Sequence, residues 1–181
     1  PKLDHNIVRP QQFICNPRER HGISLVSKSG MIWDTNKEKA IEKGNLIHEL
    51  MSHINSPTDV EITMNHFLDS GRINIDQSKM LNALILSIIS HPDLKKYYNS
   101  NSVSYNEREI IQKNDKNLRP DRIVINKDNK ATIIDYKTGA PNNYHKKQLD
   151  EYEDALKKMG YLTLKKILVY IEVESVNVTT F

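Results

Sequence analysis

RPDRIVINKDNKATIIDYKTG, residues 119–139, is the stretch that decides the fold. Two short runs rich in β-branched residues flank a polar turn at residues 127–130, which predicts one antiparallel β-hairpin. If the loop is of the three-residue type with Asn129 in the left-handed conformation, the pairing that starts at Asn126 and Lys130 places Asp121 opposite Asp135. The open end of the hairpin therefore holds two carboxylates close together.

Lys137 adds a cation to these two acids. Because side chains alternate between the two faces of a strand, Lys137 shares a face with Asp135, whereas Tyr136 points the other way. The acids can supply oxygen ligands to a hard divalent cation, and the ammonium group of Lys137 can hold a phosphate oxygen or an attacking water. The alternative is an ordinary ion-pair cluster at the end of a strand.

The residues around the hairpin acids distinguish these alternatives. Pro-Asp at residues 120–121 and Asp-Tyr-Lys-Thr-Gly at residues 135–139 together resemble the core motif of the PD-(D/E)XK nucleases. The Tyr-Lys-Thr-Gly ending resembles the RecB-type branch, which occurs fused to DNA helicases. This resemblance implies an α/β fold, a mixed β-sheet flanked by helices, with the catalytic groups at one edge of the sheet. One departure is Arg119-Pro120, where many relatives have glycine before the first aspartate.

The composition fits a single domain. With 181 residues, 38% of them hydrophobic, the chain can bury one sizeable core. We predict a nuclease domain over residues 34–181 and an irregular lead-in or tether over residues 1–33. The start at Pro1 suggests a fragment of a longer protein, although removal of an initiator methionine would leave the same start.

Charge, cysteine content and hydropathy narrow the class of protein. No run of eighteen apolar residues occurs and the first ten residues lack the core of a signal peptide, so we expect a cytoplasmic protein without a membrane span. The single cysteine, Cys15, excludes a Cys-x-x-Cys zinc site and a four-cysteine iron–sulfur cluster, which some relatives carry. The net charge of +3 is compatible with a nucleic-acid partner but too small to indicate one.

Residues 34–54 predict an early helix, with apolar residues at helical spacings: Ile41, Leu46, Ile47, Leu50, Met51 and Ile54. Gly44 lies four residues before His48 on the same face and removes bulk one turn from the imidazole. A lone helical histidine is more often solvated or packed in a core than a ligand. The resemblance implies that His48 is a metal ligand, since Gly44-Asn45-Leu46-Ile47-His48-Glu49 is similar to the Gly-x-x-x-His-Glu element of RecB-type nucleases; Glu49 and His53 are not implied.

Residues 58–98 predict two further helices and a short helical turn. The first lies around residues 60–68 and ends at Ser70-Gly71, the second begins at Asp76 and stops at His91-Pro92, and the turn covers residues 93–98. The second helix carries an apolar stripe that we expect to pack in the core: Met80, Leu81, Leu84, Ile85, Ile88 and Ile89.

Residues 102–113 alternate in polarity and predict a strand before the hairpin. Glu107 and Glu109 share one face of this strand. Many relatives place a strand glutamate near the metal, and we choose Glu107, three residues before Ile110, over Glu109 as this catalytic group. Both are compatible with ordinary strand charges.

The segment after Gly139 returns to helical period, from Asn142 or Asn143 to Lys158. Gln148 and Tyr152 lie four residues apart on one helix face and can jointly contact a DNA strand. A Gln-x-x-x-Tyr element shortly after Asp-x-Lys is a mark of the RecB-type branch, which implies DNA binding by both residues. Residues 164–173 predict a buried strand that completes the sheet.

The resemblance extends over roughly residues 42–172 and implies a metal-dependent deoxyribonuclease. An exonuclease is favoured over an endonuclease. The implied process is DNA repair or recombination. Its partners would be a DNA strand, favouring a single-stranded end, and a helicase motor on the same chain or in a complex. The implied ligands of Mg²⁺ or Mn²⁺ are His48, Asp121, Asp135 and the Tyr136 carbonyl. Lys137 would orient the attacking water or stabilise the transition state. Two alternatives stay open: a non-catalytic DNA-binding or interaction module that retains the fold, and a stand-alone endonuclease.

Overall fold

The computed structural model describes residues 37–99, 103–112, 117–172 and 175–181. The predicted lead-in over residues 1–33 lies outside these ranges, as does the predicted start of the first helix at Asp34. The described helices are α1 (Lys37–Ser52), α2 (Asp59–Asp69), α3 (Ile75–Ser90), the 3₁₀ helix η2 (Lys95–Tyr97) and α4 (Asn143–Lys158). The strands are β1 (Val103–Asn106), β2 (Ile110–Ile111), β3 (Asn117–Leu118), β4 (Arg122–Ile125), β5 (Lys130–Lys137), β6 (Leu162–Ile171) and β7 (Val176–Thr180).

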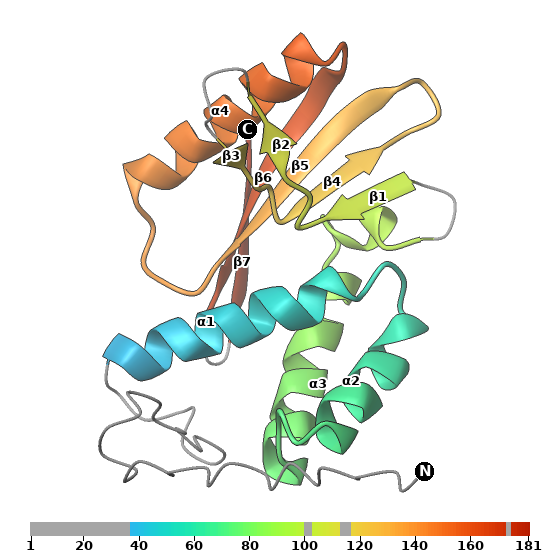
Figure 1. Cartoon of the computed structure of the whole chain (residues 1–181), viewed down its shortest axis with the longest axis vertical. Coiled ribbons are helices and arrows are strands. Elements are labelled where there is room, and N and C mark those ends of the chain that lie inside the picture. The colour runs from blue at the N-terminus through green and yellow to red at the C-terminus, as the bar shows by residue number, and fades with distance from the viewer. Residues whose placement is uncertain (1–36, 100–102, 113–116, 173–174) are drawn as a thin grey trace, which may run out of the picture.

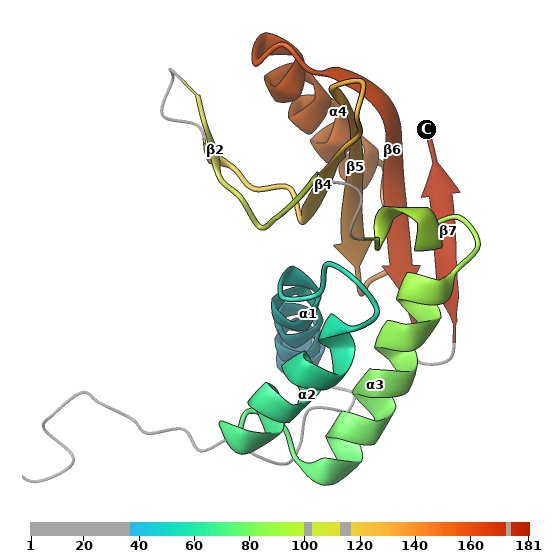
Figure 2. The same cartoon turned by 90° about the vertical axis from the view of Figure 1, so that its right-hand side faces the viewer.

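Among the described residues, five strands form a mixed sheet in the order β1-β4-β5-β6-β7. All neighbours are antiparallel except β5 and β6, which run parallel because α4 carries the chain across between them. Figure 2 shows α4 alongside β5 and β6, and α1, α2 and α3 grouped in the lower half of the molecule. The predicted α/β fold, a mixed sheet flanked by helices, is confirmed.

The alternation of side chains along the central strands separates two cores. Val124 and Ile134 pack with the apolar faces of α1, α2 and α3, whereas Ile123 and Ile133 pack with α4. Each neighbouring pair of residues thus serves opposite faces of the sheet, as period two requires. The central strands are consequently buried on both faces. Figure 1 shows α4 beside the sheet in the upper half of the molecule and α1, α2 and α3 in the lower half.

Local signals account for the helix ends. In α3, Asn74 caps the first turn and exchanges hydrogen bonds with Gln77 in a capping box. In α4, Asn142 accepts a hydrogen bond from the backbone N–H of Tyr144, and Gly160 takes a φ of 90° just beyond the last turn. The predicted helices within residues 58–98 and 142–158 are confirmed.

Three sequence expectations are wrong. The predicted strand over residues 102–113 is broken at Glu107, whose φ of 50° ends β1, and β2 pairs with β3 in a separate two-stranded sheet. The strand over residues 164–173 does not complete the sheet, because β7 pairs beyond it as the edge strand. Met80 is 48% exposed rather than buried, since it lies beside the buried stripe of α3.

Candidate active site

The hairpin β4–β5 sets the positions of the two aspartates. Asn129 has a φ of 60°, and the backbone N–H of Asn126 donates to the carbonyl of Lys130 at 3.0 Å, as expected for the three-residue loop. The register pairs Arg122 with Ile134, so Asp121, one residue earlier, comes opposite Asp135. The predicted juxtaposition of the two acids is confirmed.

Helix α1 brings His48 to this end of the hairpin. The neighbouring residues Ile47, Leu50 and Met51 are buried against the sheet, and this packing directs the half-buried imidazole at the aspartate. His48 Nδ1 lies 3.1 Å from Asp121 Oδ1. The contact joins an early helix to the central hairpin across 73 positions of sequence.

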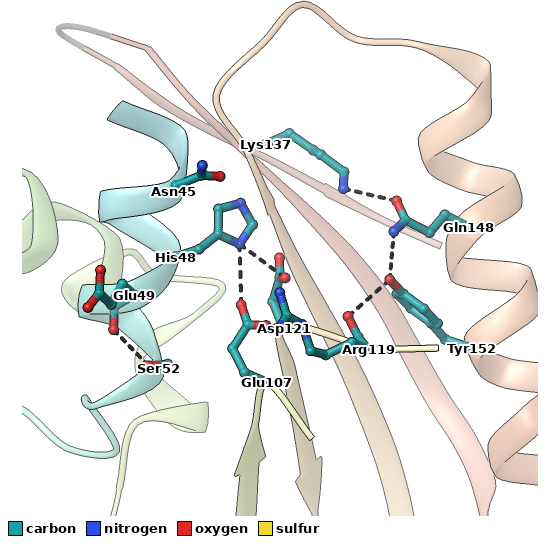
Figure 3. A pocket seen from close by; sticks show the side chains of 10 residues that line it. All are labelled: Asn45, His48, Glu49, Ser52, Glu107, Arg119, Asp121, Lys137, Gln148 and Tyr152. Carbon is teal, nitrogen blue, oxygen red and sulfur yellow. Dashed lines mark hydrogen bonds and ion pairs between the residues drawn. The ribbon is translucent and has the colours of Figure 1, made fainter. Parts of the chain in front are cut away.

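Glu107 completes a three-residue group with His48 and Asp121 (Figure 3). Its left-handed backbone, and a 2.9 Å hydrogen bond from its N–H to the carbonyl of Asp121, turn its side chain toward α1. Glu107 Oε1 lies 3.6 Å from His48 Nδ1. One potential ligand atom from each residue lies within 4.8 Å of the other two. Glu109 is exposed and is not part of this group.

The electrostatics of the group suit a cation. Burial alone would lower the pKa of His48, but the hydrogen bonds to Asp121 and Glu107 outweigh it and raise the pKa to about 10. The two carboxylates therefore stabilise the protonated, positively charged form of the imidazole that lies beside them. An imidazole nitrogen with two carboxylates is a donor set that binds Mg²⁺ or Mn²⁺, and a metal would take the place of the proton.

Asp135 lies deeper than this group and is 1% exposed. Burial, with Asp121 close by, raises its pKa to about 7, and the nearby Lys137 opposes the rise. Lys137 Nζ lies 2.6 Å from Asp135 Oδ2, yet neither carboxylate oxygen receives a well-oriented hydrogen bond from the described residues. A bound cation would supply the further partner that these buried carboxylate oxygens lack.

The other face of the strand holds Tyr136, as predicted. Its hydroxyl contacts the buried hydroxyl of Tyr98, and its backbone N–H donates to Asp121 Oδ2 at 2.6 Å. The hydrogen bond orients the Asp121 carboxylate. The role predicted for the Tyr136 carbonyl as a metal ligand stays a prediction.

Gln148 and Tyr152 form a relay that ends on Lys137 (Figure 3). Lys137 Nζ donates to Gln148 Oε1 at 2.9 Å, and Gln148 Nε2 donates to the Tyr152 hydroxyl at 2.6 Å. That hydroxyl in turn donates to the carbonyl of Arg119 at 3.2 Å. Tyr152 is 3% exposed, so its ring offers no free face for stacking with a base.

These side chains open into a cavity of about 660 Å³. It is lined by Asn45, His48, Glu49, Ser52, Glu107, Arg119, Asp121, Lys137, Gln148 and Tyr152. Four of these, Asn45, His48, Glu49 and Ser52, follow one another on α1 at spacings of three, one and three residues. This polar stripe was the available sequence signal for Asn45 and Ser52, which the motif analysis missed.

Arg119, which belongs to the departure from the motif at Arg119-Pro120, also lines the cavity. Its Nε lies 2.8 Å from Glu107 Oε2, and its side chain is 62% exposed. An exposed guanidinium beside the proposed metal ligands is well placed to bind a phosphate group.

Gly44 permits a close approach between two elements of the site. A Cβ atom at Gly44 would come within 2.8 Å of Thr138 Oγ1, so the glycine allows α1 to approach the loop after β5. Gly44 is one turn from His48 on α1, and Thr138 directly follows Lys137, so this close approach joins the two elements next to the site.

Residues 118–179 match a family model described as the PD-(D/E)XK nuclease superfamily. The match covers about a third of the chain and includes Asp121, Asp135 and Lys137. The sheet and its flanking helices agree with a nuclease fold of this superfamily. The superfamily is thus supported by sequence over the hairpin, α4 and the last strands, whereas the RecB-type branch stays a prediction.

One similar solved structure is titled "Crystal structure of SSO0001". It shares 21% sequence identity over 79% of this chain and 73% of that chain, with a TM-score of 0.33. No curated protein matches the chain. In the parts of the chain that the structure describes, no helix has the length and apolar character to span a bilayer.

Proposed function

We propose that this chain is a divalent-metal-dependent deoxyribonuclease that hydrolyses phosphodiester bonds. The observation that carries the proposal is the convergence of the three-residue group and Lys137 in one cavity, with Lys137 paired to the buried Asp135. Carboxylates, an imidazole and a lysine in this arrangement provide the groups that metal-assisted hydrolysis of a phosphate ester needs.

His48, Glu107 and Asp121 would hold the metal, Mg²⁺ or Mn²⁺. Asp135 and the Tyr136 carbonyl are proposed as further ligands. The support for Asp135 is that its buried oxygens receive no well-oriented hydrogen bond from the described residues, although Lys137 pairs with one of them. The chemistry supplied by such a cation is a lowered pKa of water and neutralisation of phosphate charge. The donor set contains no cysteine, and we propose no iron–sulfur cluster.

Lys137 is proposed to supply a second positive charge for catalysis, in addition to that of the metal. Asp135 and Gln148 hold its ammonium group from two sides, and Lys137 lines the cavity beside the proposed metal ligands. From this position it can donate to a phosphate oxygen whose negative charge grows in the transition state. Water is the proposed nucleophile. Arg119 would bind a neighbouring phosphate at the mouth of the cavity.

Gln148 and Tyr152 are proposed to act on the DNA strand in different ways. Gln148 lines the cavity and can contact the strand directly while it holds Lys137. The buried Tyr152 supports Gln148 through its hydroxyl. Their spacing also supports the finer proposal, an exonuclease of the RecB-type branch that works with a helicase motor in DNA repair or recombination. The competing proposals are a non-catalytic module and a stand-alone endonuclease.

A nuclease assay with labelled DNA tests the proposal. Linear single strands should be degraded with Mg²⁺ or Mn²⁺ and spared in excess chelator, and closed circular DNA should survive if the enzyme is an exonuclease. Lys137→Ala should lower turnover by about a hundredfold or more while calorimetry shows metal binding retained. Asp121→Ala should lose metal binding as well.

Lys147→Ala is the matched control, because Lys147 is exposed on α4 and does not line the cavity. Its activity should equal that of the unaltered protein. DNA cleavage that persists in chelator would contradict the metal-dependent mechanism. Absence of cleavage with either metal would favour the non-catalytic module.

A further inference from the structure

A second cavity, of about 290 Å³, adjoins the first and has no role in the chemistry proposed above. We call it the flanking cavity; its lining includes Ile41, Gly44 and Asn45 of α1 together with residues 138–140, 142 and 145. The two cavities share Asn45, His48 and Lys137 as a common wall. Whatever occupies the flanking cavity therefore lies next to the group proposed to act on the scissile phosphate.

One face of α1 forms one side of the flanking cavity. Ile41, Gly44, Asn45 and His48 are spaced by three, four and seven residues from the first, which places them in one row along the helix. Ile41 is 64% exposed although it is a large apolar residue at the entrance to a polar site. An exposed isoleucine at this place offers an apolar surface against which a flat ring can pack.

The loop between β5 and α4 forms the opposite side. Gly139 and Ala140 are exposed and small, so their side chains take up little of the cavity. His145 also lines the cavity, and its Nδ1 lies 3.2 Å from the Tyr170 hydroxyl. Burial, helped by Lys137, lowers the pKa of His145, so the ring is neutral at neutral pH and suits an uncharged partner.

Apolar contact at the entrance, hydrogen-bonding groups inside and a cation at the shared wall match the parts of one nucleotide: base, sugar and phosphate. The volume is at the lower limit for small-molecule sites, which admits one nucleotide but not a base pair. We propose that the flanking cavity is a nucleotide subsite, in which a nucleotide next to the scissile phosphate of a single DNA strand places its base against Ile41. This inference rests on the proposed function and adds the path of the strand from one cavity to the other.

The test compares the binding of two fluorescein-labelled strands, an oligothymidylate and a strand of equal length in which every nucleotide is abasic. Anisotropy titrations with Ca²⁺ in place of Mg²⁺ or Mn²⁺ measure affinity without the cleavage reaction. The unaltered protein should prefer the strand with bases. Ile41→Ala should weaken binding of the oligothymidylate by about fivefold through lost apolar contact and leave the abasic strand within about twofold.

Met80→Ala is the matched control, since Met80 is also a large apolar residue, 48% exposed, on a helix and lines neither cavity. It should leave both affinities unchanged. An Ile41→Ala protein that keeps the full preference for bases, or that loses affinity equally for both strands, would overturn the subsite. So would an unaltered protein without any preference.

A parallel cleavage assay with Mn²⁺ separates this inference from the proposed function. Base-dependent binding that requires Ile41, without cleavage, would refute the nuclease and retain the subsite. Cleavage that is the same in Ile41→Ala and Met80→Ala, at substrate concentrations below saturation, would refute the subsite and retain the nuclease.

Discussion

Asp121 is the residue through which the site is assembled. Its carboxylate lies beside the His48 imidazole and accepts a hydrogen bond from the Tyr136 backbone, while its own carbonyl accepts one from the Glu107 backbone. Three separate parts of the chain thus meet at one buried aspartate. The position of its side chain is fixed by the protein before any cation binds, which reduces the cost of ordering the ligands.

At the same scale, Tyr152→Phe tests whether the relay supports Lys137. The change removes the hydroxyl that accepts from Gln148 and donates to the carbonyl of Arg119, and it leaves the buried ring in place. We expect turnover to fall by about 10- to 100-fold, the usual effect of losing a group that orients a catalytic residue. Steady-state kinetics on a single-stranded substrate measures it.

Tyr144→Phe, an exposed tyrosine on the same helix, is the control and should keep full activity. Chemical denaturation should show a loss of only about 1 kcal/mol for Tyr152→Phe, the net contribution of a hydrogen bond. Full turnover by Tyr152→Phe would show that the relay does not position Lys137.

At the scale of elements, a buried arginine joins the segments that carry the proposed ligands. Arg122, which is 1% exposed, donates from Nη1 to the Ile54 carbonyl at 2.8 Å and to Asn106 Oδ1 at 3.0 Å. Its Nη2 donates to the Tyr97 carbonyl at 2.8 Å and to the Asn55 carbonyl at 3.3 Å. These contacts connect β4 to the segment just after α1, to η2 and to β1.

Arg122→Met should therefore be among the most destabilising single changes in the described part of the chain. Methionine fills a similar volume but leaves buried carbonyl groups without donors, each of which costs about 1–3 kcal/mol. We expect the free energy of unfolding to fall by about 3 kcal/mol or more, measured by urea denaturation.

Arg72→Met serves as the reference for this change. Arg72 is 56% exposed and pairs with Glu49 at the surface, so its loss should cost about 1 kcal/mol or less. Equal stabilities of the two variants would mean that the hydrogen bonds of Arg122 contribute no more than an exposed ion pair.

At the scale of the whole molecule, the proposed metal site joins elements that are distant in sequence. His48 comes from α1, Glu107 from the turn after β1, and Asp121 from the start of the hairpin, so these groups come together only in the folded chain. A cation that binds them would bind the folded state and not the unfolded chain, and it should raise the stability of the fold.

We expect Mn²⁺ or Mg²⁺ at about 100 times its dissociation constant to stabilise the protein by about 2.7 kcal/mol. For a chain of this size the gain corresponds to a rise in Tm of roughly 5–10 °C, which differential scanning calorimetry can measure and excess chelator should reverse. His48→Ala should lose most of the rise, whereas His66→Ala, an exposed histidine on α2, should keep it. An equal rise in both variants would place the metal elsewhere.

The sequence by itself determined the elements whose rules are local. The hairpin loop follows from Asn129, which tolerates a positive φ, and the period of the strand then places Asp135 and Lys137 on one face. Helix α4 follows from its cap at Asn142 and its stop at Gly160. The same local rules predicted that Asp121 and Asp135 would face each other, and the superfamily motif added the chemistry.

Only the tertiary structure decided how these elements meet. The left-handed turn at Glu107 breaks a strand that the alternation of residues predicts, because the turn is held by the carbonyl of Asp121, which is distant in sequence. The ring of Tyr152 is buried because it packs in the core between α4 and the sheet. Asp135 is 1% exposed on the same face of β5 as Ile133, which belongs to that core. Burial depends on what packs against a face, and periodicity identifies the face but not its neighbour.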